Sequence, residues 1–183
     1  MILWPFRRGT ERRTIAALYG AIVTQARSSA FYADFGVPDT VQGRFELIVL
    51  HLVLLLRRLG RENGTGQAFG QQLFDTFCRD LDENLREMGI GDLAVPKHMR
   101  RFGEAFYGRQ AAYLAALDAE DTTDFENALA RNIFQVMGPD ERAARLARYV
   151  RAARRELDVR DCASITRGEV AFPKPEAFVN VRA

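Results

Sequence analysis

The fold of this protein is decided by the stretch Leu47-Ile-Val-Leu-His-Leu-Val-Leu-Leu-Leu56, which holds nine aliphatic residues and one histidine. Ten residues in a helix span only about 15 Å, half the hydrocarbon core of a bilayer. Charged residues close the run on both sides, with Glu46 before it and Arg57 after it. We therefore predict a central helix over 41–59 that is buried on all sides and does not span a membrane.

Helical periodicity extends along the chain on both sides of this stretch. Apolar residues recur at intervals of three and four, which is typical of helices that bury one face. Thr10 is suited to cap the first helix, Gly89 to end a helix and Pro96 to begin one. Besides the central helix, the predicted helices cover about 10–26, 66–88, 96–118, 121–136 and 140–157, with a short helical turn at 28–35.

The same pattern defines the domain organisation. Alternation typical of strands is not found, and from Val159 onward a glycine and two prolines predict an irregular tail. We expect an all-α fold, a compact single-domain bundle of about seven helices. Its parts are an N-terminal segment 1–9, a helical domain 10–158 and an irregular C-terminal tail 159–183.

Composition excludes several classes of protein. Of the 183 residues, 48% are hydrophobic and 27% are charged, as in ordinary globular domains, and a net charge of +2 gives no sign of a DNA-binding protein. Cys78 and Cys162 lie far apart, which excludes a disulfide framework and favours a reducing compartment. The chain begins without a secretory signal pattern, so we expect a cytoplasmic location.

The titratable residues give no catalytic or metal-binding constellation. The serines lie outside any nucleophile elbow, and only two histidines are present, which argues against a hydrolytic triad or a zinc site. Arg79 and Arg86 stand among the carboxylates of the helix over 66–88, and Asp82 and Arg86 are spaced as an i,i+4 ion pair. We interpret His51 as a core histidine bonded to a neighbour. We predict no enzyme activity, no metal and no cofactor.

The last predicted helix has an apolar arc of about 120° and a basic face outside it. A solvated face is the simpler interpretation. The alternative is an anionic partner, such as ribosomal RNA, lipid headgroups or an acidic protein surface. The arginines of this basic face are Arg142, Arg145, Arg148, Arg151 and Arg155.

The most specific pattern lies in the middle of the chain. It consists of Leu85-Arg-Glu-Met-Gly-Ile-Gly-Asp92, Val95-Pro-Lys97 and Phe106-Tyr-Gly-Arg109, in this order. Upstream stand Phe31-Tyr32 and Gly43-Arg-Phe-Glu46. With their spacing, these elements resemble the ubiquinol–cytochrome c chaperone family over about 15–150.

This resemblance implies an all-helical, non-enzymatic assembly factor for the cytochrome b–c complex. Members of the family hold newly made cytochrome b, and the mitochondrial members act with a small partner protein near the ribosomal tunnel exit. A chain of this length without a transit peptide is similar to the bacterial members. The implied partner is nascent or apo-cytochrome b, and a ribosome or an anionic membrane surface is a further expected contact. The location would then be cytoplasmic and peripheral at the inner membrane.

A chaperone for a membrane protein needs an apolar groove, and we expect that groove at the linker 89–96 and the helix after it. The linker glycines permit close approach of another chain, and Asp92 is suited to cap a helix. Arg86 or Arg109 is expected to pair with Asp80 or Asp92. A purely architectural linker is the alternative. The candidate client-binding residues are Asp80, Arg86, Gly89, Gly91, Asp92, Leu93, Pro96, Phe102, Phe106, Tyr107 and Arg109.

Two other functions stay open on the sequence. In one, His51 faces an open cavity and the bundle binds haem or a quinone. In the other, the protein is a ribosome or lipid adaptor that acts through the basic face and through Trp4-Pro-Phe6. The apolar segment 2–6 followed by Arg7 and Arg8 predicts at most weak contact with an anionic membrane interface.

Overall fold

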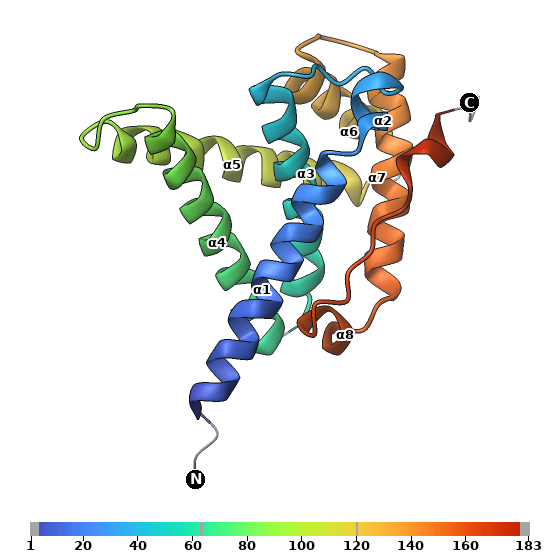
Figure 1. Cartoon of the computed structure of the whole chain (residues 1–183). Coiled ribbons are helices and arrows are strands. Elements are labelled where there is room, and N and C mark those ends of the chain that lie inside the picture. The colour runs from blue at the N-terminus through green and yellow to red at the C-terminus, as the bar shows by residue number, and fades with distance from the viewer. Residues whose placement is uncertain (1–3, 63, 120, 180–183) are drawn as a thin grey trace.

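The computed structural model describes residues 4–62, 64–119 and 121–179, and this part of the chain is helical without any strand (Figure 1). The long helices are α1 (Trp4–Ala26), α3 (Val41–Gly60), α4 (Thr65–Glu87), α5 (Val95–Leu117) and α7 (Glu141–Val159). The short elements are α2 (Ser29–Ala33), α6 (Thr123–Leu129), the π-helix η1 (Ala130–Phe134), α8 (Cys162–Thr166) and the 3-10 helix η2 (Pro175–Phe178). The predicted all-α bundle is confirmed.

Helix α3 lies at the centre of the bundle and contacts α1, α4, α5, α7 and η1. The whole run 49–55 is buried, so α3 has no side that faces solvent along these residues. At its start, the Thr40 side chain accepts a hydrogen bond of 3.1 Å from the Gly43 N–H and caps the helix. The central helix predicted over 41–59 is confirmed. Within the described part of the chain, no helix is both long enough and apolar enough for a bilayer crossing.

His51 is the polar centre of this apolar core. Its Nδ1–H donates to the Leu47 carbonyl at 2.7 Å, and its Nε2 accepts from the Tyr149 hydroxyl at 2.7 Å. A carbonyl can only accept, which fixes the proton on Nδ1. Burial lowers the pKa of His51 to about 4. The expected core histidine is confirmed. The haem or quinone alternative required His51 to face an open cavity, whereas His51 is fully buried and both of its ring nitrogens are bonded within the core.

Helix α1 begins earlier than the sequence pattern indicates. It starts at Trp4, so the predicted start at Thr10 is wrong. Pro5 stands in the first turn, where a fixed φ favours helix and the missing N–H costs no hydrogen bond. Residues 7 and 8 are therefore helical, whereas residues 1–3, part of the proposed interfacial segment, lie outside the described residues.

The C-terminal tail covers the core, which its irregular sequence does not reveal. After α8 the chain runs beside α7 toward η2 (Figure 1). The Phe172 ring meets His51 edge-on with 5.0 Å between ring centres, and Gln25 donates to the Pro173 carbonyl at 3.0 Å. Ile165 is fully buried. The predicted irregular backbone therefore includes short helices and supplies part of the core.

We expect stability to fall as the pH drops from 7 to 5, because His51 has a lower pKa in the folded state than its ordinary 6.5. The unfolded chain then binds more protons than the folded one, which makes this contribution about 2 kcal/mol over that interval. His51→Gln removes the titration and should flatten the pH dependence in urea unfolding followed by circular dichroism. The exposed histidine supplies the control His98→Gln, which should behave as wild type. Equal slopes for His51→Gln and wild type would contradict this prediction.

Candidate functional site

Helices α4 and α5 form a hairpin that projects from the bundle (Figure 1). Helix α4 ends in a Schellman motif, in which the Gly89 N–H donates to the Arg86 carbonyl at 2.9 Å and the Ile90 N–H donates to the Leu85 carbonyl at 3.1 Å. Gly89 has a φ of 83°, which a residue with a side chain rarely adopts. The predicted C-terminal glycine cap is confirmed. We refer to residues 86–101 as the hairpin tip.

An ion pair closes the turn of the hairpin tip. Arg86 contacts Asp92, and it also contacts Asp82 at 2.7 Å across one turn of α4. The expected pairing of Arg86 with Asp92 is confirmed, as is the pair with Asp82. Asp92 does not cap α5, because its carboxylate is bound to Arg86 and the N-cap position is occupied by Ala94 without a side-chain bond. Pro96 stands in the first turn, as expected.

Arg109 makes a different ion pair from the one expected. Its guanidinium contacts both oxygens of Glu46 on α3, with Nε to Oε2 at 2.7 Å and Nη2 to Oε1 at 2.6 Å. The Glu46 side chain is 1% exposed and also accepts a bond from Gln42. Burial raises the pKa of Glu46, and its bonds to Arg109 and Gln42 oppose that rise. Asp80 accepts instead from the Tyr19 hydroxyl at 2.7 Å, so its expected role as an arginine partner is wrong.

The far end of α5 is also fixed to the bundle. Asp118, which follows α5, contacts Arg57 of α3 at 2.7 Å and Arg154 of α7 at 3.3 Å. Arg154 also donates to the Leu117 carbonyl at 2.8 Å. Together with Glu46 and Arg109, these contacts hold the C-terminal half of α5, whereas its N-terminal half extends into the hairpin.

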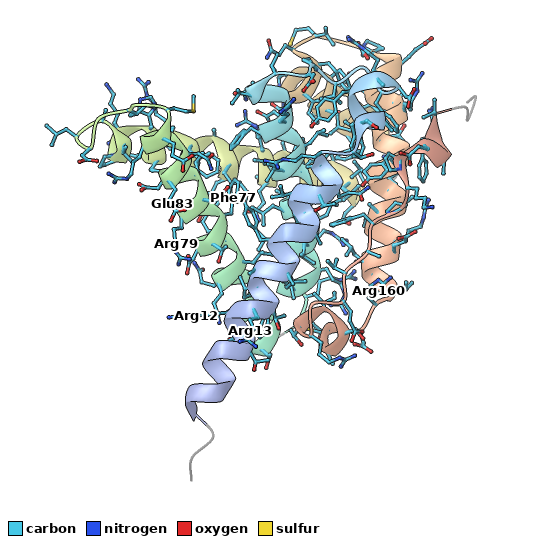
Figure 2. All side chains as sticks on the ribbon, viewed as in Figure 1. Arg12, Arg13, Phe77, Arg79, Glu83 and Arg160 are labelled. Atoms are coloured by element: carbon cyan, nitrogen blue, oxygen red, sulfur yellow. The ribbon has the colours of Figure 1, made fainter. Side chains whose placement is uncertain are left out.

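Aromatic rings fill the space between α4 and α5. Phe74 and Phe106 have ring centres 4.8 Å apart, and Phe77 and Phe102 have ring centres 5.3 Å apart. Figure 2 shows Phe77 on the side of α4 toward the bundle, with Arg79 and Glu83 on the outer side. The ring of Tyr107 lies 6.1 Å from Phe74, at the edge of the cluster. This aromatic cluster comprises Phe45, Phe74, Phe77, Phe102, Phe106 and Tyr107.

Apolar side chains of the hairpin differ in burial. Leu73 is fully buried, whereas Leu81, Leu85, Met99 and Phe102 are only half-buried. Tyr107 is 60% exposed, although its neighbour Phe106 is 1% exposed. The hairpin therefore presents an apolar and aromatic surface that its own chain covers only in part.

A glycine beside Tyr107 adds to this open surface. Gly103 lies one helical turn before Tyr107, and a Cβ atom added there would meet no atom within 4 Å apart from its chain neighbours and the backbone of its own helix. Nothing inside the molecule therefore requires glycine at this helical position, where alanine is the better helix former. Sequence reasoning missed Gly103, and its only signal was a glycine within a helical pattern.

The structure places the candidate residues in three groups, which are the aromatic cluster, the polar links to the bundle and the hairpin tip. Phe106 is a core residue, Phe102 is at the half-buried edge, and Tyr107 is on the surface. The pair of Arg109 with Glu46 and the pair of Tyr19 with Asp80 are structural links within the bundle. The hairpin tip carries the rest of the candidates, namely Arg86, Gly89, Gly91, Asp92, Leu93 and Pro96.

The basic face of α7 does not form one exposed row. Its apolar arc is buried, as predicted. Arg142 contacts Asp140 at 2.7 Å, Arg145 donates to the Asp34 carbonyl, and Arg151 lies over the Phe125 ring at 5.7 Å. Arg148 is also half-buried, and of these five arginines only Arg155 is exposed. Most of these arginines are thus positioned by contacts within the molecule.

The fold defines an all-helical protein whose α4–α5 hairpin leaves apolar side chains partly exposed. Within the described residues, no three His, Cys, Asp or Glu side chains gather closely enough for a metal ion. Residues 33–172 match the model of the ubiquinol–cytochrome c chaperone family, and the chain belongs to this family. The family resemblance seen in the sequence is thereby confirmed.

Individual relatives agree with this assignment. The chain is 39% identical to the Cbp3 homolog from Brucella abortus, whose crystal structure superposes with a TM-score of 0.87 over 96% of this chain and 98% of that one. It is 26% identical to the ubiquinol-cytochrome-c reductase complex assembly factor 1 of Xenopus laevis, over 86% of this chain and 80% of that protein. The mouse counterpart is also 26% identical over 84% of this chain. The matched region covers about half (53%) of the mouse protein.

We expect Arg109→Leu to lower the free energy of unfolding by about 3–5 kcal/mol, because it leaves the buried carboxylate of Glu46 without its cation. The double variant Glu46→Leu with Arg109→Leu should recover most of this loss, since it removes both charges. Arg79→Leu, on the outer side of α4, is the control and should change stability by about 0.5 kcal/mol or less. Chemical unfolding measures all three. Equal losses in the single and double variants would show that the pair is not the cause.

Proposed function

We propose that this protein is an assembly chaperone that binds newly made cytochrome b and supports the biogenesis of ubiquinol–cytochrome c reductase. It acts by binding and does not catalyse a reaction. Membership of the ubiquinol–cytochrome c chaperone family supports the role in complex assembly. The observation that carries the site is the apolar surface between α4 and α5, which the chain itself leaves partly uncovered.

The chemistry of this surface fits a membrane protein before insertion. A newly made transmembrane helix outside the bilayer exposes apolar side chains to water, and their burial contributes about 25 cal/mol per Å² before the entropic costs of association. Half-buried Leu81, Leu85 and Phe102 offer apolar contacts on the hairpin. By contrast, the apolar arc of α7 is already buried inside the bundle and has nothing to offer a client.

Tyr107 is the residue best placed to anchor a client. Its ring already packs on Phe74 and Phe106, so its orientation is restricted before binding, and it is nevertheless 60% exposed. Tyrosine combines a large apolar body with a polar end, which suits a site that is wet on one side. Gly103, one turn away, allows a client backbone to approach α5 closely.

Tyr107→Asp should weaken the binding of apo-cytochrome b by roughly 30-fold, which corresponds to about 2 kcal/mol for an aromatic anchor. Its exposure allows the fold to survive, which circular dichroism checks, whereas Phe106→Asp would disrupt the core. The control is Val41→Asp, which also exchanges an exposed apolar side chain, 73% exposed, but lies outside the hairpin. Co-purification from a membrane extract measures binding. Normal capture by a folded Tyr107→Asp protein would contradict the proposed site.

Gly103→Ala should have opposite effects on stability and on binding. We expect it to raise the free energy of unfolding by about 0.5–1 kcal/mol, because alanine favours helix and its Cβ meets no neighbour. The same Cβ should weaken the capture of cytochrome b by holding the client backbone away from α5. Gly20→Ala, an equally open glycine of α1, should stabilise the fold and leave capture unchanged. Unchanged capture by Gly103→Ala would place the client elsewhere.

A further inference from the structure

The hairpin tip combines exposed apolar residues with exposed basic ones. Leu93 is 99% exposed and Met88 is 67% exposed, in a turn that projects from the bundle (Figure 1). The first two turns of α5 carry Lys97, Arg100 and Arg101, all of them exposed. Their spacing of three and four places these three cations on one side of the helix.

The charge of the tip is positive. From 86 to 101 the chain has four basic residues and two acidic ones. One of the acidic residues, Asp92, is already paired with Arg86. Arg100 has a carboxylate nearby only at 3.8 Å, in Glu104, and this side chain is itself 70% exposed. Lys97 and Arg101 have no ion pair among the described residues. The tip therefore has cations available for an anionic surface.

The geometry of Leu93 does not fit the wall of a groove. A wall residue packs on its neighbours and leaves one side open, as Tyr107 does, whereas Leu93 is almost completely surrounded by solvent. Exposed apolar side chains at a projecting turn, with basic residues beside them, match the interface of a bilayer. Apolar side chains enter the headgroup region there, while arginine and lysine bind the lipid phosphates.

We propose that the hairpin tip docks on the surface of a bilayer that contains anionic phospholipid. Leu93 and Met88 enter the headgroup region, and Lys97, Arg100 and Arg101 bind the phosphates. Lys97 and Tyr107 are ten residues apart on one helix, so the proposed client surface lies at most about 15 Å from the bilayer surface. This inference deepens the proposed function by placing client binding at the membrane, but it does not require a client in order to be tested.

Flotation of the full chain with protein-free vesicles tests the docking. One set consists of phosphatidylcholine with about a quarter of phosphatidylglycerol, and the other consists of phosphatidylcholine alone. The wild-type protein should float with the anionic set only, and added salt should release it. Lys97→Gln with Arg101→Gln should lower the partition coefficient about 30-fold, since each basic residue near an anionic surface contributes a factor of about five. Leu93→Asp should abolish flotation.

Matched controls make the result specific. Met137→Asp replaces an apolar residue that is 86% exposed outside the hairpin, and Arg79→Gln with Lys174→Gln removes two exposed cations elsewhere. Both control proteins should float as wild type does. The proposal would be overturned if Leu93→Asp floated as the wild-type protein does. It would also be overturned if deletion of residues 1–8, with the hairpin tip intact, abolished flotation. Since the vesicles hold no protein, a failure of the flotation test would not contradict the proposed binding of cytochrome b. In the same way, a failure of client capture would not contradict the proposed docking on the bilayer.

Discussion

Complete burial of the middle of α3, residues 49–55, is the constraint on which the rest of the structure depends. A helix that is apolar on all sides must be enclosed, and α1, α4, α5, α7 and the tail each contribute to that enclosure. The one histidine in the run is accommodated because both of its nitrogens are hydrogen-bonded, which avoids the cost of an unsatisfied buried polar group. Gln25 and Tyr149 extend this network to α1, α7 and the tail, so the polar centre also sets how the surrounding segments meet.

Contacts with this core fix the position of the hairpin of α4 and α5, but the core does not cover all of the apolar surface of the hairpin. Glu46 and Arg109 link α5 to α3, and Asp118 links its far end to α3 and α7. A buried ion pair contributes little net stability, whereas loss of one partner is costly because it leaves the other charge buried without a counterion. The N-terminal half of α5 packs on α4 and, through Phe102, on Phe45 of α3, and its apolar surface stays partly open. The proposed binding surface thus lies on the part of α5 that precedes its ion pairs with α3 and α7.

Two parts of this hairpin are assigned different chemistry. The middle of α5 offers an aromatic side chain and an open glycine, which suits an apolar chain that approaches closely. The tip offers basic residues around a single projecting leucine, which suits the phosphates of a bilayer. Both proposals use one rigid helix, so the distance between client and membrane would be set by the length of α5.

The sequence by itself determined the elements whose cause is local. Periodicity predicted α3 and α7 to within a residue or two at each end, and the Thr40 and Gly89 caps depend on hydrogen bonds within a few residues. Only the tertiary structure decided that Arg109 binds a carboxylate 63 positions away, although both residues lie in segments that resemble the family. It also decided that Phe106 is buried while Tyr107 is exposed, and that the tail covers the core. The physical reason is that periodicity reveals which face of a helix is apolar, whereas exposure and long-range pairing depend on which other helix covers that face.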